Sequence, residues 1–346
     1  MEYTTLSTTD LRVSKICLGT MSYAAQVSES DAFVQMEYAL GNGVNFWDTA
    51  EMYPIPVNPD LIGDTERIIG RWFKKTGKRK DVVLATKIAG PSRFSYLRDG
   101  DQKLDRRNIA RAIDDSLIKL QTDWIDLYQL HWPDRNVPMF GQRGYTHDPA
   151  DKPTPIEETL SALGEAVKAG KIRHVGLSNE TPWGVMEFLR IAKEKGYPRM
   201  VSIQNAYNLL NRHFETGLSE ISHRENIGLL PYSPLGYGIL GGRYFDGSFP
   251  QGGRFTLHPE FAVRYRTPQA EQAAKAYADL AKKHGLSLPT MALAFVNSRP
   301  FVTSNIIGAS LLAQLKEDIA SLNVTLSPDV LNGIEQIHEQ WPNVVA

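Results

Sequence analysis

The chain is poor in cysteine and has no long hydrophobic run. Its single cysteine, Cys17, excludes internal disulfides and is typical of a reducing compartment, so we expect a buried structural thiol and a cytoplasmic protein. No apolar run approaches the ~20 residues that span a bilayer, so we expect no membrane contact. Residues 1–5 carry neither a basic nor an apolar segment, and we therefore expect no secretory signal.

Charge of one sign and metal-ligand motifs are also missing. The 38 lysines and arginines nearly balance the 39 acids, giving a net charge of −1, and the two signs are interspersed. Without a basic block, the sequence does not indicate a nucleic-acid partner. It contains no His-Glu-x-x-His motif and only one cysteine, so we expect no metal site.

Strand-like and helix-like runs alternate along the chain. Strands are expected at 15–19, 44–48, 82–87, 125–130, 172–177, 200–204, 227–232 and 302–307. Helices are expected at 31–40, 65–75, 107–120, 155–169, 182–194, 214–224, 268–284, 289–297 and 311–321. This alternation predicts an α/β fold with parallel strands and right-handed crossovers. With 346 residues, of which 42% are hydrophobic, a closed (β/α)8 TIM barrel is favoured over an open doubly wound sheet.

Two segments fall outside the repeat. Residues 3–14 are expected to form a β-hairpin that plugs the bottom of the barrel, and 328–340 an extra C-terminal helix outside it. Long connections follow four of the strands, at 52–64, 89–104, 133–155 and 235–267. They are expected at the C-terminal face, where barrel proteins hold their sites. Because no linker is visible, we expect one domain over 1–346.

Four polar residues follow apolar runs near predicted strand ends: Asp48, Tyr53, Lys87 and His131. Taken singly, each has an ordinary explanation as a turn, packing or solvated residue. In a barrel, however, the C-terminal ends of the strands line one shared pocket. An acid, a phenol, an amine and an imidazole gathered there can deliver a proton to a carbonyl oxygen.

Four stretches resemble motifs of the aldo-keto reductase family. In 45–53, Asp48 and Tyr53 stand five apart; 84–87 looks like the family's lysine strand, 123–132 like its histidine strand, and 171–179 like its Gly-x-Ser-Asn signature. The resemblance covers nearly the whole chain in order. It is closest to the bacterial Tas-like branch and to the branch that contains potassium-channel β subunits.

The resemblance implies an NADPH-dependent oxidoreductase that reduces aldehydes or ketones to alcohols by reversible hydride transfer. Tyr53 would be the general acid. Free tyrosine has a pKa near ~10, and we expect the Lys87 cation to lower the pKa of Tyr53. Asp48 would keep Lys87 charged, and His131 would orient the carbonyl oxygen.

The resemblance also implies a cofactor site, with NADP favoured over NAD. The residues expected to contact the nicotinamide and the pyrophosphate are Thr20, Ser178, Asn179, Gln204, Tyr232, Ser233 and Leu235. In this set Tyr232 would stack on the nicotinamide ring, because an aromatic side chain offers a large planar area.

The adenosine 2′-phosphate and adenine are expected to meet a second group: Arg243, Ser310, Gln314, Glu317 and Asp318. Ser310 is the expected N-cap of the last repeat helix, where a phosphate is favoured. The chain departs from the family pattern here. It has Gly308 where many members carry Lys, Gln314 where they carry Arg, and Asp318 where they carry Asn. Asp318 is expected to place a negative charge close to the phosphate.

Residues 236–241 match Gly-x-Gly-x-x-Gly after a strand, and Glu260 stands about 20 residues further on, as a Rossmann site would require. We reject that interpretation, because glycines and Pro250 follow where a helix should open. The segment is expected instead to be a loop over the cofactor's phosphates.

Two alternative functions remain. A regulatory barrel of the channel-β kind would bind NADPH, turn over slowly and serve a protein partner. We expect no long N-terminal extension that could act as a blocking segment, and this expectation favours the enzyme. A hydrolase or glycosidase would need paired carboxylates, and only Asp48 stands at a suitable strand end. For the reductase, Met21 and Trp132 are expected to line the pocket of a small carbonyl substrate.

Overall fold

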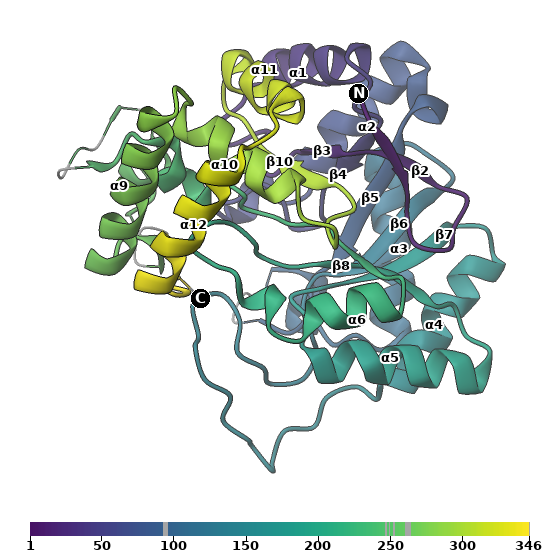
Figure 1. Cartoon of the computed structure of the whole chain (residues 1–346). Helices are drawn as coiled ribbons and strands as arrows, with labels where there is room; N and C mark the ends of the chain where they lie inside the picture. Colours follow the sequence, from purple (N-terminus) through teal and green to yellow (C-terminus); the bar gives the residue numbers. More distant parts are fainter. Residues whose placement is uncertain (93–95, 246–247, 249, 252, 260–263, 346) are drawn as a thin grey trace.

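Eight parallel strands form the centre of the molecule. The structure is a computed structural model that describes residues 1–92, 96–245, 248, 250–251, 253–259 and 264–345. The strands are β3 (Ile16–Gly19), β4 (Phe46–Asp48), β5 (Val83–Ile88), β6 (Ile125–Leu130), β7 (Ile172–Ser178), β8 (Met200–Gln204), β9 (Gly228–Leu229) and β10 (Asn305–Ile307). They pair in the order β10-β3-β4-β5-β6-β7-β8-β9 (Figure 1).

The sheet closes on itself between β9 and the segment that leads into β10. Leu229 forms a parallel bridge with Val302. Its N–H donates to Phe301 O at 2.8 Å, and Thr303 N–H donates to Leu229 O at 2.9 Å. The predicted (β/α)8 barrel is therefore confirmed.

Helices connect the strands and cover the barrel. They are α1 (Glu29–Gly41), α2 (Asp64–Thr76), α3 (Arg106–Leu120), α4 (Ile156–Lys168), α5 (Pro182–Lys195), α6 (Leu218–Arg224), α7 (Arg254–Leu257), α9 (Pro268–Lys283), α10 (Leu288–Asn297), α11 (Leu312–Ala320) and α12 (Pro328–Gln340). Local signals set their ends. Asp105 caps α3 by accepting a hydrogen bond from Asn108 N–H, and Thr181 caps α5 just before Pro182.

Several predicted elements differ from the observed ones. The strand expected at 227–232 is reduced to β9, and Pro231 within that run has no N–H to donate. The helix expected at 214–224 is divided into a 3-10 turn, His213–Glu215, and α6, because Gly217 between them has a φ of +107°. Strand β5 continues through Ile88, one residue beyond its predicted end at Lys87.

The N-terminal hairpin closes the bottom of the barrel, as predicted. Its strands β1 (Tyr3–Thr5) and β2 (Arg12–Ser14) pair antiparallel. Buried side chains of the hairpin pack against barrel residues in one cluster: Leu6, Leu11 and Val13 with Cys17, Phe46, Ala85, Leu127, Val201, Leu230 and Ile306. The extra helix α12 lies outside the barrel beside α9 (Figure 1), and Glu335 on it accepts hydrogen bonds from Arg212.

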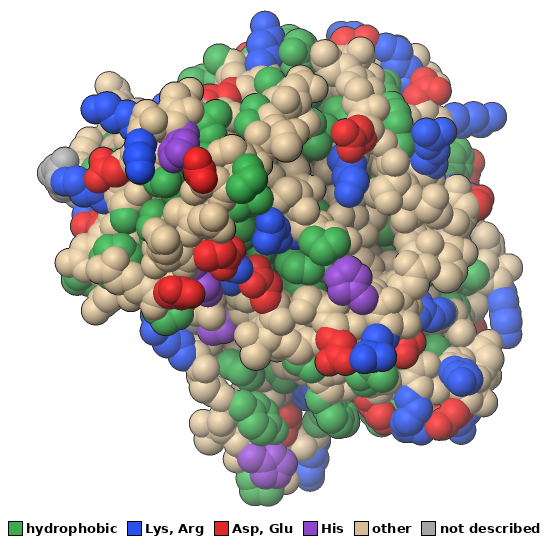
Figure 2. All heavy atoms as spheres, in the orientation of Figure 1, with side chains coloured by type: hydrophobic (Ala, Val, Ile, Leu, Met, Phe, Trp, Pro, Cys, Tyr) green, Lys and Arg blue, Asp and Glu red, His purple; other side chains and the backbone are tan. Residues whose placement is uncertain are grey.

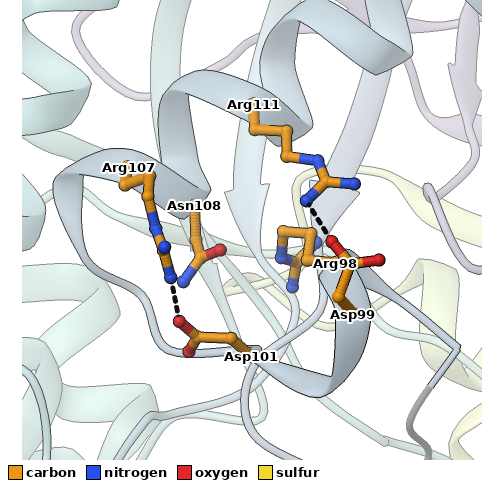
Figure 3. Close-up of a pocket in the computed structure, with 6 residues that line it drawn as sticks. All are labelled: Arg98, Asp99, Asp101, Arg107, Asn108 and Arg111. Carbon is orange, nitrogen blue, oxygen red and sulfur yellow. Dashed lines mark hydrogen bonds and ion pairs between the residues drawn. The ribbon is translucent and has the colours of Figure 1, made fainter.

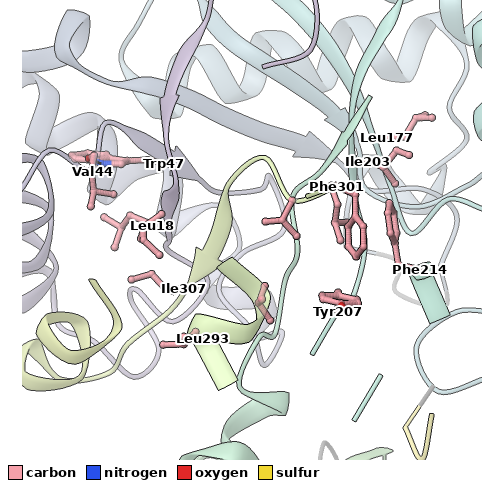
Figure 4. Close-up of a cluster of buried hydrophobic side chains, with 14 of the residues drawn as sticks. Leu18, Val44, Trp47, Leu177, Ile203, Tyr207, Phe214, Leu293, Phe301 and Ile307 are labelled. Carbon is pink, nitrogen blue, oxygen red and sulfur yellow. Dashed lines mark hydrogen bonds between the residues drawn. The ribbon is translucent and has the colours of Figure 1, made fainter. Parts of the chain in front are cut away.

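The strands alternate between two environments. Outward side chains pack under the helices: Trp47, for example, stacks on Phe73 and lies 4.9 Å from Trp72, both on α2. Figure 4 shows buried apolar side chains at two places, with Leu18, Val44 and Trp47 near Ile307, and with Phe214 and Phe301 near Ile203 of β8. Inward positions are apolar next to the hairpin and polar at the opposite end, which positions the candidate site.

The surface carries charges of both signs. Figure 2 shows basic and acidic side chains interspersed over the face that it views. In the part of the chain that the structure describes, no helix has the length and apolar character needed to cross a bilayer.

Gly70→Ala is expected to destabilise the fold. A Cβ at Gly70, on α2, would lie 2.3 Å from Lys119 O and 2.8 Å from the backbone carbon of Leu120, at the end of α3. Overpacking of this kind costs ~1–3 kcal/mol, more than the helix propensity of alanine returns. Gly41→Ala is the matched control, because a Cβ there would meet no atom within 4 Å other than those of its chain neighbours and its own helix backbone. In urea unfolding, the free energy of unfolding should fall for Gly70→Ala and stay unchanged for Gly41→Ala. Equal stability of the two variants would contradict the packing described.

Candidate active site

A buried lysine and aspartate form the centre of the candidate site. Lys87 Nζ donates to Asp48 Oδ2 at 2.6 Å and to Thr49 O at 2.7 Å, and it lies 3.3 Å from Tyr53 Oη. Lys87 is fully buried, and Asp48 is 3% exposed. The structure thus brings together three of the four residues expected at the strand ends.

Two glutamines complete the surroundings of the aspartate. Asp48 Oδ1 accepts from Gln204 Nε2 at 2.8 Å and from Gln129 Nε2 at 3.1 Å. Gln129 was not expected from the sequence. The alternation of side chains along a strand could have predicted it. Gln129 stands opposite Lys87 in the β5–β6 register and points to the same inward face.

The electrostatics of the tyrosine differ from the expectation. Burial raises the pKa of Tyr53 well above its usual value, and Asp48 and Tyr237 raise it further. Burial lowers the pKa of Lys87, while the Asp48 carboxylate opposes this shift. The net shift of the Tyr53 pKa is therefore upward, and the expected lowering is wrong, because burial of the phenolate and the Asp48 charge outweigh the Lys87 cation. The phenol stays protonated at neutral pH, as a proton donor requires.

His131 faces the tyrosine from the end of β6. The two ring centroids are 5.6 Å apart in an edge arrangement. Burial, together with the Lys87 charge, lowers the pKa of His131 well below its usual value, so the imidazole is neutral. Within the described residues, its Nδ1 has no hydrogen-bond partner. A neutral imidazole with a free ring nitrogen can orient a carbonyl oxygen by donating an N–H to it.

The residues expected at the nicotinamide form a hydrogen-bonded row beside His131. Tyr232 Oη donates to Asn179 Oδ1 at 2.7 Å, and Asn179 Nδ2 donates to His131 O at 2.8 Å. Ser178 Oγ donates to Gln204 O at 2.7 Å. On the other side of Asp48, Thr20 Oγ1 donates to the Asp48 backbone carbonyl at 2.9 Å. Five of the seven residues expected at the nicotinamide and the pyrophosphate are therefore linked by hydrogen bonds to Asp48 or His131, directly or through one another.

The connection after β9 has no helix where a Rossmann site would need one. Residues Gly236–Gly241 form 3-10 turns in which Tyr237 and Gly238 have φ values of +56° and +106°. The rejection of a Rossmann site is thus confirmed, while Glu260 lies outside the described residues. Ser233 and Leu235 begin this connection, and Arg243 is exposed on it.

The last group differs in two ways from the expectation. The N-cap of α11 is Leu311 and not Ser310. Gln314 Oε1 instead accepts from the backbone N–H groups of Ser310 and Leu311, at 3.1 and 3.2 Å. Asp318 is 4% exposed, and burial, with a contribution from Glu317, raises its pKa to about 8. The expected negative charge at Asp318 is therefore mostly absent at pH 7. Glu317 Oε1 accepts from Ser287 Oγ at 2.7 Å, at the N-terminus of α10.

An apolar wall stands next to the tyrosine. Trp132 belongs to a buried cluster with Tyr53 and Ala89, and Met21 packs against that cluster. The Trp132 ring lies 4.8 Å from His131, and its Nε1 donates to Pro91 O at 2.9 Å. Both residues expected to line the substrate pocket thus lie near Tyr53.

Among the residues that the structure describes, no pair of free carboxylates is found at this end of the barrel. Asp48 is bonded to Lys87, and the nearby Glu51 forms a buried ion pair with Arg98. Within the described residues, no cluster of His, Cys, Asp and Glu could hold a metal ion. The arrangement supports proton delivery to an uncharged group and not the two-carboxylate chemistry of a glycosidase.

Fold and site together define a (β/α)8-barrel protein with a buried lysine–aspartate pair beside a phenol. Residues 15–339 match the model of the "Aldo/keto reductase family", and the chain belongs to this family. Membership supports oxidoreductase activity on carbonyl groups. Among similar proteins, "Protein tas" of Escherichia coli (strain K12) is 47% identical over 343 residues, with 99% of each chain covered.

Two further relatives span almost the whole chain. "Uncharacterized oxidoreductase YrpG" of Bacillus subtilis (strain 168) is 34% identical over 341 residues, covering 97% of this chain and 96% of that protein. "Probable voltage-gated potassium channel subunit beta" of Arabidopsis thaliana is 29% identical over 351 residues, covering 99% and 98%.

Asp318→Asn is expected to remove a pH dependence of stability. The Asp318 carboxyl has a pKa of about 8 when folded, against ~3.9 in an unfolded chain. The folded state therefore binds one more proton between these values, and stability falls as pH rises from ~4 to ~8. In urea unfolding, the free energy of unfolding of the variant relative to that of the original chain should rise by on the order of 2–3 kcal/mol between pH 5.5 and 8.

Asp279→Asn, at an exposed acid on α9, is the control for this experiment. It should unfold in parallel with the original chain at every pH. A difference between Asp318→Asn and the original chain that stays constant with pH would mean that Asp318 is ionised in the folded protein.

Proposed function

We propose that the chain is an NADPH-dependent reductase of aldehydes or ketones, with Tyr53 as the proton donor. The observation that carries the proposal is the buried series Tyr53–Lys87–Asp48, with separations of 3.3 and 2.6 Å, at the C-terminal face of the barrel. Family membership supports the same reaction class. We further propose that residues 1–346 form one domain around this barrel.

NADPH, when bound, supplies the hydride that reduces the carbonyl carbon. As negative charge grows on the carbonyl oxygen, Tyr53 Oη gives it a proton. Lys87 then stabilises the phenolate, and Asp48 holds Lys87 charged in a pocket where an unpaired cation would be costly. His131 donates an N–H to the carbonyl oxygen and orients it.

The chemistry of the polar row supports a nicotinamide at this place. A carboxamide both donates and accepts hydrogen bonds, and Ser178, Asn179 and Gln204 offer groups of both kinds. Tyr232 supplies a ring for stacking, while Thr20 directly follows β3 and Ser233 and Leu235 lie in the connection after β9. Met21 and Trp132 favour an apolar carbonyl substrate, because their side chains adjoin Tyr53.

NADP is favoured over NAD as the cofactor. Arg243 offers an exposed cation, Ser310 and Gln314 offer polar groups at the start of α11, and Glu317 and Asp318 follow on the same helix. Asp318 is largely uncharged at pH 7, which removes the main electrostatic objection to a phosphate there.

Tyr53→Phe should abolish carbonyl reduction while NADPH still binds. The substitution removes the proton donor and little else, and a positioned acid contributes about 10²–10⁴-fold to the rate. The kcat is measured from NADPH absorbance over a panel of aldehydes and ketones, and binding from protein fluorescence. Tyr145→Phe, at an exposed tyrosine, is the control and should keep full activity. Retention of most of the kcat by Tyr53→Phe would rule out its role as the acid.

Arg243→Gln should weaken NADPH binding about tenfold and leave NADH binding unchanged, because one charge-assisted contact to the 2′-phosphate is lost. Fluorescence titrations with both cofactors measure the two Kd values. Arg224→Gln, at an exposed arginine of α6, should change neither. Equal losses for NADPH and NADH would place Arg243 away from the 2′-phosphate.

A regulatory barrel of the channel-β kind is the second candidate. The 29% identity to a relative named as a channel β subunit, over 99% of this chain, favours it. Turnover separates the two functions. An enzyme should consume many equivalents of NADPH with a suitable aldehyde, whereas a mainly regulatory barrel should oxidise its bound NADPH slowly and little more.

A further inference from the structure

The backbone of Ala89 is held by two side chains. Ala89 follows the last residue of β5, is fully buried and lies two positions beyond Lys87. Its N–H donates to Glu51 Oε1 at 2.6 Å, and its carbonyl oxygen accepts from Arg98 Nη2 at 2.7 Å. Buried backbone groups need partners, and here side chains supply both.

The two side chains also bind each other. Arg98 donates to Glu51 Oε1, and the side chains are 2% and 3% exposed. Together with Ala89 they form a closed set of three contacts, which we name the Glu51–Arg98 rung. Just beyond the end of β5, the two side chains bind the backbone N–H and carbonyl oxygen of Ala89, as a neighbouring strand would. A buried ion pair that is also hydrogen-bonded to the backbone on both sides has a defined geometry, because any displacement leaves a charge unpaired.

The rung lies between the parts of the candidate site. Glu51 stands between Asp48 and Tyr53 in the connection after β4, and its N–H donates to Lys87 O at 3.2 Å. Tyr53 N–H donates to Ala50 O at 3.1 Å, so a backbone hydrogen bond that spans Glu51 connects the tyrosine to this segment. The Glu51 carboxylate thus fixes the Tyr53 connection against the strand that carries Lys87.

Arg98 reaches the rung from a loop of unusual backbone conformation. Arg98 and Asp99 have φ values of +47° and +58°, a region that residues other than glycine rarely adopt. Figure 3 shows how this loop is tied to α3: Asp99 accepts from Arg111 at 2.8 Å, and Asp101 pairs with Arg107. The neighbouring Leu97 belongs to the buried cluster that contains Tyr53.

We infer that the Glu51–Arg98 rung positions Tyr53 against Lys87 for proton transfer. The inference deepens the proposed function and depends on it. The distance that the rung maintains is the 3.3 Å between Tyr53 Oη and Lys87 Nζ. Glu51 and Arg98 act through Ala89 and the Tyr53 connection, and so they are positioning residues. A misplacement of ~1 Å at a reacting group costs about 100-fold in rate.

The test compares Arg98→Met with Arg111→Met in the whole protein. Both arginines are drawn in Figure 3, and both substitutions remove a guanidinium from an ion pair, but only Arg98 belongs to the rung. Fluorescence titration with NADPH counts the binding-competent molecules, and kcat is expressed per competent molecule. Arg98→Met should lower kcat about 10–100-fold, with the Kd for NADPH unchanged. Arg111→Met should keep kcat, because its ion pair is half-exposed.

Two milder variants keep the test decisive if Arg98→Met does not fold. Arg98→Lys retains a cation that can reach Glu51 but loses the fork that also serves Ala89 O, and it should recover part of the kcat. Glu51→Gln retains an acceptor for Ala89 N–H without the charge, and it should lower kcat more than it changes the KM for the carbonyl. A purely structural pair would lower the melting temperature and leave kcat per competent molecule unchanged, which would overturn the inference.

Tyr53→Phe, measured in parallel, separates this inference from the proposed function. If Tyr53→Phe stays active, the proposed function fails, and the positioning role fails with it. If Tyr53→Phe is inactive while Arg98→Met, Arg98→Lys and Glu51→Gln all keep the full kcat, only the positioning role is overturned.

Discussion

The buried ion pair between Lys87 and Asp48 is the interaction on which the site depends. Two charges removed from water are costly unless both are paired and hydrogen-bonded. The barrel meets this condition, because Thr49 O accepts a second hydrogen bond from the lysine, and Gln129 and Gln204 donate to the other carboxylate oxygen. Gln129 and Gln204 come from β6 and β8, so the full set of partners forms only when the strands are assembled.

The exclusion of water that makes the ion pair costly also sets the protonation states of its neighbours. Burial penalises a phenolate and an imidazolium, so Tyr53 keeps its proton and His131 stays neutral. Both states suit donation to a carbonyl oxygen. The hairpin at the other end of the barrel contributes, because its buried leucines and valine close the bottom with apolar packing.

Much of this arrangement could be predicted from the sequence, because it follows from strand periodicity and local motifs. The eight strands, the hairpin, the C-terminal helix and the positions of Asp48, Tyr53, Lys87 and His131 belong to this part. Other features depend on contacts between distant segments. Gln129 matters because it stands opposite Lys87 in the barrel. The state of Asp318 depends on its burial, and the Glu51–Arg98 rung joins two connections that are far apart in the sequence.

The sequence by itself determined which chemical groups stand near the ends of the strands, since residue identity and the two-residue alternation of strands are local properties. Only the tertiary structure decided how those groups behave. Closure of the barrel removed them from water, placed a carboxylate against the lysine and held the tyrosine 3.3 Å from it. The pKa of each group depends on burial and on its nearest charges, and both are set by packing.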